Sequence, residues 1–272
     1  MKQPRKHLLC LLLALWLTGV LLAGCAADTA DSNADLPVIT VGCDNYPPFN
    51  YVNGNGQPAG IDVELAAEAF RRMGYRPEYI TINWTEKNAL LESGAIDCIW
   101  GCFSMNGRED EYTWAGPYMY SHQVVAVMPD SDIQTLADLA GKTVVVQATT
   151  KPESLFLDGN DPRIPEIRAL HSLQKQELIY SHLAKGYADA VATHEISLLQ
   201  YMADYGSEFR ILEEPLEVVG LGVAFSRSDD RGIAQALSAT LEQMRTDGTT
   251  RSILASYLAD PDKYLEADGY AD

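Results

Sequence analysis

Apolar residues in this chain come in short runs, and the run at residues 38–41 shows the pattern most clearly. Val38-Ile39-Thr40-Val41 is β-branched throughout and ends at Gly42, which predicts a buried strand. The strand is followed by Cys43-Asp44-Asn45-Tyr46-Pro47-Pro48-Phe49, whose two prolines fix φ and hold the loop extended. An acid and two aromatic rings therefore lie where open α/β sheets bind their ligands, at the carboxyl end of a buried strand.

Similar runs alternate with helical patterns along the rest of the chain. Ile61, Leu65 and Ala69 recur at helical spacing before Gly74, and Asn53-Gly54-Asn55-Gly56 predicts a tight turn. The later strands are expected over residues 77–82, 96–100, 124–128, 143–147, 166–170, 188–192 and 220–225, and the helices over residues 62–73, 86–92, 135–139, 152–157, 173–185, 195–204, 231–246 and 252–258. Two such alternations predict two α/β lobes, each a parallel sheet with helices on its faces.

The N-terminus follows a different pattern. Lys2, Arg5 and Lys6 precede an apolar stretch over residues 8–22, which is shorter than a membrane-spanning helix. A positive start, a short apolar core and small residues behind it are typical of a secretory signal peptide. We therefore expect residues 1–24 to be such a signal peptide.

The residues that follow indicate how the signal peptide ends. Leu22-Ala23-Gly24-Cys25 resembles a bacterial lipobox, so we expect Cys25 to become the lipidated first residue, with palmitate in its anchor. Residues 25–35 are small and polar and would form a flexible linker. Plain cleavage after Ala26 or Ala27 and an uncleaved anchor are the alternatives.

The charge balance changes the set of plausible partners. The chain carries 38 acidic and 20 basic residues, a net charge of −18, and loss of residues 1–24 removes three positive charges and no acid, leaving −21. So acidic a body repels nucleic acid and anionic lipid surfaces, and neither is an expected partner. The ligand stays open, because a local pocket can oppose the global charge.

Cysteine usage argues against a disulfide framework or a metal centre. Cys10 leaves with the signal peptide and Cys25 is the lipidation candidate, so Cys43, Cys98 and Cys102 remain. An odd number permits at most one bridge among them. We favour small buried thiols, with a bridge from Cys43 to one of the others as the alternative. No Cys or His cluster has ligand spacing, so no metal and no cofactor is expected.

Several short segments together resemble the amino-acid-type extracellular solute-binding proteins of ABC importers, family 3, with the type II periplasmic-binding fold. The resemblance spans about residues 37–260 and depends on the shared order and spacing of the segments. These are Tyr46-Pro47-Pro48-Phe49, Gly60-Ile61-Asp62-Val63-Glu64-Leu65, Leu91-Glu92-Ser93-Gly94-Ala95-Ile96-Asp97, Gly116-Pro117-Tyr118, Leu139-Ala140-Gly141-Lys142, Thr149-Thr150, Gly186-Tyr187-Ala188-Asp189-Ala190-Val191 and Arg245-Thr246-Asp247-Gly248-Thr249.

The resemblance implies a two-lobed α/β fold in which each lobe is a mostly parallel sheet flanked by helices. Lobe 1 would comprise residues 36–120 and 222–272, and lobe 2 residues 121–221, with two hinge crossings. It also implies a monomeric receptor, not an enzyme, that closes on a polar amino acid or related small carboxylate. The receptor would deliver this ligand to the permease subunits of an ABC transporter, outside the bacterial cell membrane to which its lipid anchor holds it.

Arg108 is the strongest candidate for contact with the ligand. It closes a second loop, residues 101–108, at the end of an expected strand, and its guanidinium offers two parallel donors that fit a carboxylate. In the resembled family an arginine here binds the ligand α-carboxylate. The loop is one residue shorter between Ser104 and Arg108 than the commoner family pattern. A surface salt bridge with Glu109 or Asp110 is the alternative.

A second contact with the carboxylate is expected from Thr149, Thr150 and Lys151. Thr150 and Glu153 have capping-box spacing, and Pro152 suits the first turn of a helix. The helix N-terminus would present N–H groups that favour an anion. A purely structural cap is the alternative.

Aromatic side chains supply candidates for the apolar part of the ligand. Tyr46, Phe49 and Trp84 are expected to stack on it or enclose it, with a plain core position as the alternative for Phe49. Cys102 and Ser104 belong to the second loop, where backbone groups and the serine hydroxyl would contact the ligand.

His194 departs from the family pattern, which usually has an aspartate here to bind the ligand α-ammonium. A neutral imidazole accepts a hydrogen bond from an ammonium group, but with less Coulomb attraction than a carboxylate. In one alternative Asp44 or Glu195 carries the charge, and in another the ligand lacks a standard α-ammonium. A solvated or helix-capping His194 is the third.

Two other functions stay open at this point. One is an enzyme on the same scaffold, resembling the periplasmic cyclohexadienyl dehydratases, with His194 and Asp44 as acid and base. The chain has no nucleophile elbow and no phosphate-binding loop in support of it. The other is a sensor subunit that binds a ligand and signals through a partner protein.

Overall fold

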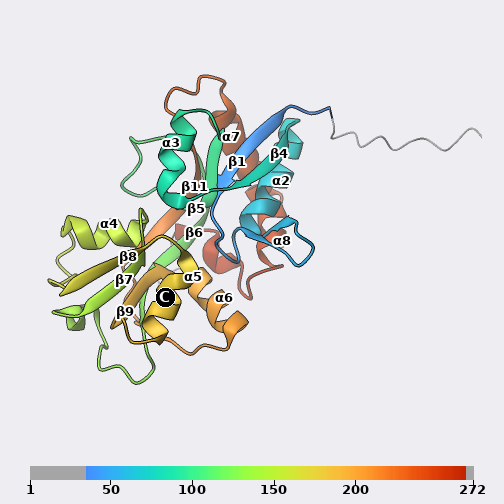
Figure 1. Ribbon diagram of the computed structural model, residues 1–272. Coiled ribbons are helices and arrows are strands. Elements are labelled where there is room, and N and C mark those ends of the chain that lie inside the picture. Colours follow the sequence, from blue (N-terminus) through green and yellow to red (C-terminus); the bar gives the residue numbers. More distant parts are fainter. Residues whose placement is uncertain (1–34, 268–272) are drawn as a thin grey trace, which may run out of the picture. The chain divides into compact units, whose positions relative to one another are not determined.

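Strands and helices alternate through residues 35–267, the part of the chain that the computed structural model describes (Figure 1). The strands are β1 (Val38–Cys43), β2 (Tyr51–Val52), β3 (Pro58–Ala59), β4 (Arg76–Thr81), β5 (Cys98–Ser104), β6 (Thr113–Val127), β7 (Thr143–Gln147), β8 (Ala169–Leu173), β9 (Ala190–His194), β10 (Arg210–Ile211) and β11 (Glu217–Phe225). The α-helices are α2 (Ile61–Met73), α3 (Lys87–Glu92), α4 (Lys151–Asp158), α5 (Gln176–Ala184), α6 (Glu195–Tyr205), α7 (Ile233–Thr246) and α8 (Thr249–Leu254). Short 3₁₀ turns are η1 (Trp84–Glu86), η2 (Leu136–Leu139) and η3 (Asp262–Tyr264).

The chain divides into two units, residues 1–36 and residues 37–272. Of the first unit only residues 35 and 36 are described. The predicted signal peptide, the lipidation candidate Cys25 and nearly all of the predicted linker therefore lie outside the described residues. The strands and helices belong to the second unit.

Nine strands of the described region form one hydrogen-bonded sheet in the order β4-β1-β5-β11-β6-β9-β7-β8, with β10 paired to β6. β1 is parallel to β4 and β5, and β7 is parallel to β8 and β9. Between these two parallel groups, β11 and β6 are antiparallel to their neighbours. The predicted α/β class is confirmed, and the two parallel groups are called lobe 1 (β4, β1, β5) and lobe 2 (β9, β7, β8) below.

β6 and β11 lie side by side and run from one lobe to the other (Figure 1). The first part of β6 pairs with β11, and its last five residues pair with β9. Tyr120 lies opposite Gly220 in this ladder, where the two hinge crossings are predicted. The predicted lobe boundaries, at residues 120/121 and 221/222, stay a prediction.

The strand predicted over residues 124–128 is too short, because β6 begins at Thr113. A Gly-Pro pair normally interrupts a strand, but Gly116 and Pro117 lie within this one. The pairing of β6 with β11 shifts register between Leu221 and Val223, and this bulge absorbs the proline that a regular ladder would exclude. The Gly116 N–H instead donates to Ser238 Oγ on α7 at 3.2 Å.

Several other bounds also differ from the prediction, three of them at places that bear on the site or the C-terminal helices. β5 continues through Gly101 to Ser104, so that Cys102 and Ser104 belong to a strand and not to a loop. Gly101 is needed for a close contact and not for a turn, because a Cβ there would lie 3.3 Å from the ring of Trp84. β8 begins at residue 169 instead of 166, and the final helix begins at residue 249 instead of 252.

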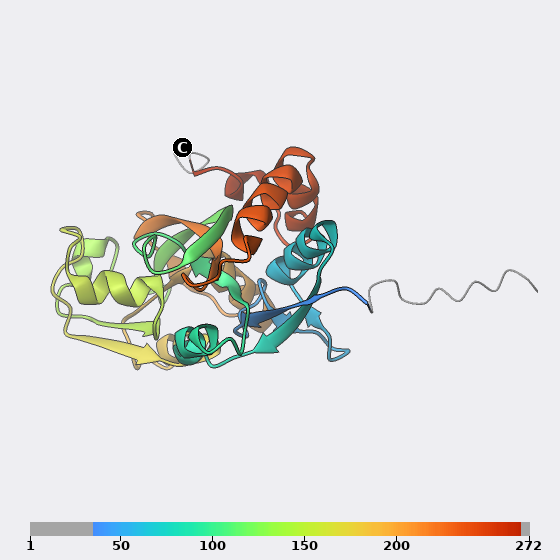
Figure 2. The same cartoon turned by 90° about the horizontal axis from the view of Figure 1, so that it is seen from above.

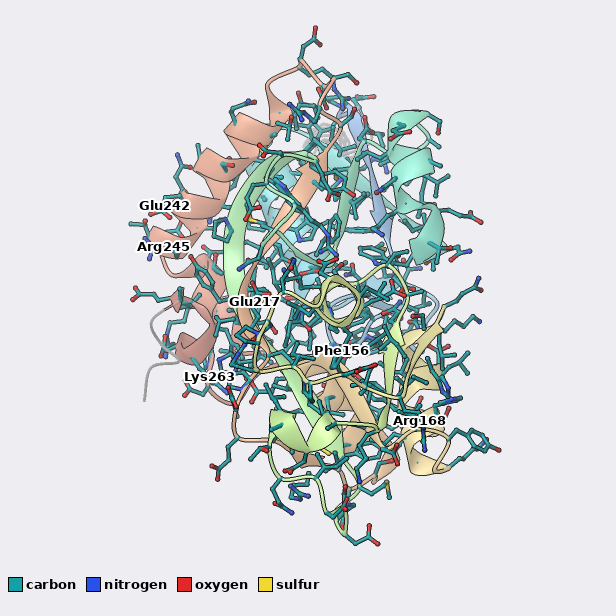
Figure 3. All side chains as sticks on the ribbon, turned by 90° about the vertical axis from the view of Figure 1, so that its left-hand side faces the viewer. Phe156, Arg168, Glu217, Glu242, Arg245 and Lys263 are labelled. Carbon is teal, nitrogen blue, oxygen red and sulfur yellow. The ribbon has the colours of Figure 1, made fainter. Side chains whose placement is uncertain are left out.

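Each lobe has helices packed on both faces of its strands, with a hydrophobic core under each layer. In lobe 1, α2 and α7 pack over one face and α3 with Trp84 over the other (Figure 2). In lobe 2, α5 and α6 cover one face, while η2 and α4 cover the other. The outer side of α7 carries polar residues such as Glu242 and Arg245 (Figure 3). The two ends of the one large sheet are thus covered by separate sets of helices, as a two-lobed molecule requires.

The three cysteines of the described region are free and buried. Burial raises the pKa of the Cys43 thiol to about 12 and holds the pKa values of Cys98 and Cys102 well above their usual range. The predicted buried thiols are confirmed, and the alternative of a bridge from Cys43 is wrong in this structure.

Gly60 joins the loop after β1 to the N-terminus of α2. Its φ of 122° lies in a region that favours glycine, and a Cβ there would come 2.3 Å from the carbonyl oxygen of Phe49. The approach is this close because the Ile61 and Asp62 N–H groups donate to the Pro48 and Phe49 carbonyls at 2.9 and 3.0 Å. The loop that carries Tyr46 is thereby fixed to a helix.

Replacing Gly60 with alanine should destabilise the protein by about 3 kcal/mol, because the new Cβ meets backbone atoms and the φ angle is strained for an L-residue. Gly54→Ala is the matched control, since a Cβ at Gly54 would meet nothing within 4 Å, and it should stay within about 0.5 kcal/mol of wild type. Urea denaturation of both variants measures the difference. Equal stabilities would contradict the account of this junction.

Candidate functional site

A cavity lies where several strands of the two lobes end. Its walls come from the loop after β1, from η1, from β5 and the loop behind it, and from the ends of β7 and β9. The lining residues are Asp44, Tyr46, Trp84, Gly101, Cys102, Phe103, Ser104, Arg108, Gln147, Thr150, Lys151 and His194. Nine of the predicted ligand-binding residues line it; Phe49 and Thr149 do not.

Arg108 enters this cavity without an acidic partner. Its Nη1 donates to the Ser104 carbonyl at 3.2 Å, and the guanidinium lies over the Phe103 ring at 5.2 Å. Among residues 35–267 it forms no ion pair, so the alternative of a salt bridge with Glu109 or Asp110 is wrong. Burial lowers the pKa of this guanidinium. A desolvated cation with donors to spare is suited to receive an anion.

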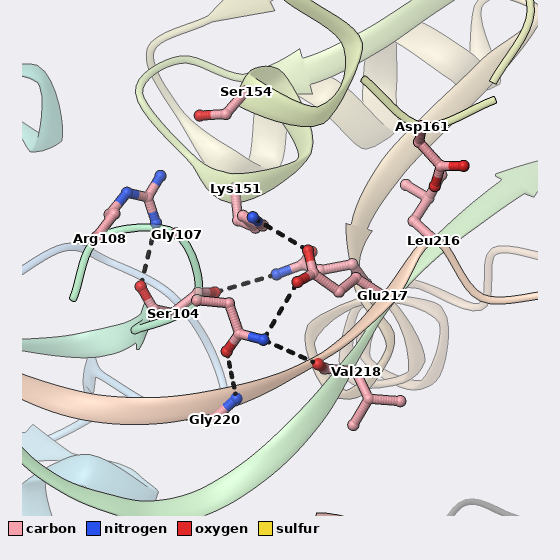
Figure 4. A network of polar contacts seen from close by, with 12 residues as sticks. Ser104, Gly107, Arg108, Lys151, Ser154, Asp161, Leu216, Glu217, Val218 and Gly220 are labelled. Carbon is pink, nitrogen blue, oxygen red and sulfur yellow. Dashed lines mark hydrogen bonds and ion pairs between the residues drawn. The ribbon is translucent and has the colours of Figure 1, made fainter. Parts of the chain in front are cut away.

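The loop that carries Arg108 is fixed to the crossing strand β11 (Figure 4). Asn106 Nδ2 donates to Glu217 Oε1 at 3.2 Å and to the Val218 carbonyl at 3.3 Å, while its Oδ1 accepts from the Gly220 N–H at 3.0 Å. Glu217 in turn pairs with Lys151 Nζ at 3.1 Å. These contacts hold Arg108 in place although its loop is short.

Lys87 is a second buried cation beside the cavity, and nothing in the sequence pattern predicted it. It is 5% exposed, and its Nζ donates across the cleft to Thr149 Oγ1 at 3.0 Å and to the Thr149 carbonyl at 3.2 Å. Burial, together with the nearby Arg108, lowers the pKa of Lys87 to about 8. Both oxygen atoms of Thr149 thus accept hydrogen bonds from Lys87. The φ angle of Thr149 is 58°, which is unusual for a β-branched residue.

The capping box predicted at Thr150 and Glu153 does not form. The Thr150 hydroxyl donates to the Gln147 carbonyl at 2.6 Å, and Glu153 Oε2 accepts from the Thr149 N–H at 2.5 Å. The positive φ of Thr149 gives the carboxylate an N–H donor one residue earlier than the box requires. Thr150 and Lys151 still line the cavity at the start of α4.

Asp44 and Gln147 face each other across the cavity. Gln147 Nε2 donates to Asp44 Oδ2 at 2.5 Å, and the Asn45 N–H donates to Oδ1 at 2.7 Å. Burial raises the pKa of the Asp44 carboxyl to about 6, against these hydrogen bonds. Gln147 is 3% exposed and its Oε1 has no partner within residues 35–267. Two acceptors, one anionic and one neutral, are therefore close together.

His194 ends β9 and is 6% exposed, so the solvated alternative is wrong. It occupies the N-cap position of α6 but makes no capping hydrogen bond with its side chain. Gln123 Nε2 donates to its Nε2 at 2.8 Å, and Nδ1 lies 3.1 Å from Ser121 Oγ. Burial, with Arg108 nearby, lowers the pKa of His194 to about 3. The imidazole is neutral, and both of its nitrogens have partners inside the protein.

The aromatic candidates fall into two groups. Tyr46 and Trp84 line the cavity, and the Tyr46 hydroxyl lies 3.3 Å from Thr193 Oγ1 in lobe 2. Phe49 is fully buried, with its ring 6.1 Å from that of Tyr46 and 6.4 Å from that of His194. The core alternative holds for Phe49, which supports Tyr46 from behind.

The wall formed by β5 depends on a buried carboxylate that the sequence did not single out. Asp62 is 1% exposed, and its Oδ2 accepts from the Cys102 N–H at 2.8 Å and from Asn50 Nδ2 at 3.0 Å. The first bond stabilises the positive φ of 49° at Cys102, a conformation in which a non-glycine residue is uncommon. Ser104 follows in the same strand, and its Oγ accepts from Gln123 Nε2 at 3.3 Å.

Charges in the cavity are separated. Arg108, which has no acidic partner in the described region, lies beside Lys87, while the anionic Asp44 is bonded to Gln147. Such an arrangement suits a small ligand with an anionic and a cationic end, enclosed by aromatic rings. Gln147 and Lys87 escaped the sequence reasoning because glutamine and lysine at strand and helix ends are common on surfaces. Only the fold shows that both are buried.

Fold and site together define a two-lobed solute-binding architecture, and comparison with known proteins agrees. The family model of the bacterial extracellular solute-binding proteins, family 3, matches residues 39–260. The chain is 28% identical to the glutamate-binding protein GluB of Corynebacterium glutamicum over 275 residues, which is 92% of this chain and 90% of GluB. It is 30% identical to the histidine-binding periplasmic protein of Salmonella typhimurium, and the match covers 80% of this chain and 86% of that protein.

Among solved structures, Tv2483 bound to L-arginine superimposes with a TM-score of 0.75 at 24% identity, over 82% of this chain and 91% of that one. At this identity the likeness supports the fold alone. The chain belongs to the bacterial extracellular solute-binding proteins, family 3, and the predicted family is confirmed. Within residues 35–267 no helix is long and apolar enough to cross a membrane.

The pKa of His194 has a consequence for stability. The unfolded chain protonates this side chain near its ordinary pKa of 6.5, whereas the folded protein keeps it neutral down to about 3. As the pH falls through this window the unfolded state gains the proton first, so folded stability is lost. Between about pH 7 and about pH 4.5, wild type should lose about 2.5 kcal/mol more unfolding free energy than His194→Gln.

Denaturation of both proteins at the two pH values measures this difference. The contributions of the other titrating groups to the pH dependence are the same in both proteins and cancel in the comparison. The imidazole signals of His194 in NMR spectra should also stay constant down to about pH 5. A His194 titration near pH 6.5, or equal losses in the two proteins, would show that the imidazole is not buried as described.

Proposed function

We propose that this protein is an extracytoplasmic receptor that captures a polar amino acid, or a related small carboxylate, and delivers it to the permease of an ABC transporter. The observation that carries the proposal is Arg108, a partly buried guanidinium in the cleft with no acidic partner in the described region. A ligand carboxylate would supply that partner through two parallel hydrogen bonds. Glutamate-binding and histidine-binding relatives support an amino acid as the ligand.

The ammonium end of the ligand is assigned to Asp44 and Gln147, and not to His194. Asp44 offers a carboxylate and Gln147 a buried oxygen without a partner in the described region, whereas both His194 nitrogens have partners. An ammonium group would replace the Gln147 amide as donor to Asp44 and favour its ionised form. Tyr46 and Trp84 would enclose the rest of the ligand, with Ser104, Cys102, Thr150 and Lys151 around it.

Capture would occur by closure of the lobes. In the described region three hydrogen-bonded residue pairs join lobe 1 to lobe 2 at the cavity: Asp44 with Gln147, Tyr46 with Thr193, and Lys87 with Thr149. A ligand that binds residues on both sides stabilises the closed state more than the open one, and so shifts the equilibrium between them. The hinge would lie in β6 and β11. The receptor would act as a monomer and without enzymatic activity, since His194 is not free to serve as a base.

Ligand binding should raise the free energy of unfolding by about 2.7 kcal/mol at a hundred times the dissociation constant. Thermal unfolding of the full chain against the standard L-amino acids, and against carboxylates without an amine, identifies the ligand. Arg108→Ala should weaken the binding of that ligand about a hundredfold, because a charge-assisted hydrogen-bonded pair between the guanidinium and the ligand carboxylate is lost. Arg71→Ala is the control, since its side chain is 61% exposed and pairs only with Glu68 within the described region.

Stabilisation by one or a few amino acids, lost in Arg108→Ala and kept in Arg71→Ala, supports the receptor. Small-angle scattering should then show a smaller radius of gyration with the ligand. Stabilisation only by amine-free carboxylates would refute the assignment of Asp44 and Gln147. Conversion of the bound compound to a product would refute the non-enzymatic function, and no stabilisation by any compound would refute the receptor.

Cys25 is proposed to anchor this receptor to the outer face of the bacterial cell membrane. The lipobox resemblance of residues 22–25 supports this. Cells that express the full chain and are fed labelled palmitate should incorporate the label and retain the protein in the membrane fraction. Cys25→Ala should abolish both, and Cys10→Ala should abolish neither. Label that persists in Cys25→Ala would contradict the anchor.

A further inference from the structure

A second cavity lies on the other side of the loop after β1. Asp44 and Tyr46 line the first cavity, whereas Asn45 and Pro47 line the second. The remaining walls come from α5 and α6 and consist of Gln176, Glu177, Tyr180, Ser197, Tyr201, Asp204 and Tyr205. Nothing in the proposed function uses this cavity.

A hydrogen-bonded partition separates the two cavities. The Tyr46 hydroxyl lies 3.3 Å from Thr193 Oγ1, and the Tyr180 hydroxyl lies 3.2 Å from the same atom. Gln176 Nε2 also donates to Thr193 Oγ1, at 3.0 Å. Tyr46 belongs to the first cavity, and Gln176 and Tyr180 belong to the second, so the two are distinct sites.

The walls of the second cavity are negatively charged. Glu177 and Asp204 contribute carboxylates, and no lysine, arginine or histidine of the described region lines the cavity. Glu177 forms no ion pair or hydrogen bond through its side chain with the described part of the chain. Asp204 accepts a hydrogen bond at 2.8 Å from Nε2 of Gln200, a neutral side chain that leaves the negative charge of Asp204 unbalanced. The cavity therefore has two negative charges and no positive charge from residues 35–267 to balance them.

Three tyrosine rings form another part of the wall. Tyr201, Asp204 and Tyr205 lie on one side of α6, three and four residues apart. The ring centroids of Tyr180 and Tyr201 are 4.4 Å apart, and those of Tyr201 and Tyr205 are 4.6 Å apart. Tyr205 is 69% exposed and leaves the outer end of this stack open to solvent. Aromatic faces beside carboxylates attract organic cations.

Gln176 adds a buried acceptor. Its side chain is 3% exposed, and its Nε2 donates to the hydroxyl groups of Tyr180, Thr193 and Ser197. Its Oε1 has no hydrogen-bond partner within residues 35–267. A buried carbonyl oxygen without a donor is costly, and a ligand N–H group would satisfy it.

We propose that this second cavity binds a small organic cation that carries N–H donors, either an alkylammonium or an alkylguanidinium. The two carboxylates would balance its charge, the tyrosines would pack on its alkyl part, and Gln176 Oε1 would accept one of its hydrogen bonds. A bare metal ion fits less well, because two carboxylates and aromatic rings are a poor ligand set for it. The site is independent of the amino-acid site and of the function proposed for it.

Calorimetric titration of the full chain with butylammonium and butylguanidinium tests the proposal. At least one should bind with one site per chain, while butyrate, of opposite charge, should not bind. Glu177→Gln combined with Asp204→Asn should weaken binding about tenfold or more, and Tyr201→Leu should weaken it as well. Glu213→Gln is the control, because this exposed acid lies outside the cavity.

Arg108→Ala separates the two sites, since it should leave cation binding unchanged even where it abolishes amino-acid binding. Tetramethylammonium, which has no N–H group, should bind more weakly than butylammonium. Equal binding of the two would overturn the role of Gln176. The site itself would be overturned if neither cation bound at millimolar concentration, or if the Glu177/Asp204 double variant bound as tightly as the Glu213→Gln control.

Discussion

Two cations meet at the cleft: the partly buried Arg108, which lines the cavity, and the buried Lys87 beside it, neither of which has a carboxylate to pair with in the described region. Removing a charge from water is costly unless a counter-charge or several hydrogen bonds compensate. Lys87 donates hydrogen bonds to neutral oxygen atoms of Thr149. Arg108 donates one hydrogen bond to the Ser104 carbonyl and lies over the Phe103 ring. The compensation is incomplete, and a ligand anion would complete it. This incomplete compensation is the physical basis for the proposal that the cleft takes an anionic group.

The fold maintains this arrangement through contacts behind the walls of the cavity. Asn106 holds the Arg108 loop to β11, and Asp62 holds the bend of β5 at Cys102. Gly60 ties the Tyr46 loop to α2. Asn106 follows β5, Asp62 belongs to α2 and Gly60 precedes that helix, so all three residues lie beside the strands of lobe 1. Lobe 1 would thus present one half of the proposed site, and Gln147, Thr193 and Thr149 contact it from lobe 2.

The alternation of strands and helices, and the position of the cavity at the strand ends, could be predicted because both follow from local periodicity and from sheet geometry. The length of β6 could not, since Gly116-Pro117 is a breaker unless a bulge opposite accommodates it. Among the site residues, Arg108 and Asp44 stand out by residue type alone. Lys87 and Gln147 owe their roles to burial, which depends on tertiary contacts, and the same contacts place Phe49 in the core and engage Thr149 with Lys87.

The most direct test of the central claim is a crystal structure of the protein with the amino acid that stabilises it. The account predicts ligand carboxylate oxygens at about 2.7–2.9 Å from the Arg108 guanidinium, with the ammonium group bonded to Asp44 and Gln147 Oε1. His194 should keep its bonds to Gln123 and Ser121. A ligand that presents its amine or an apolar group to Arg108, or whose ammonium displaces Gln123 from His194, would contradict the account.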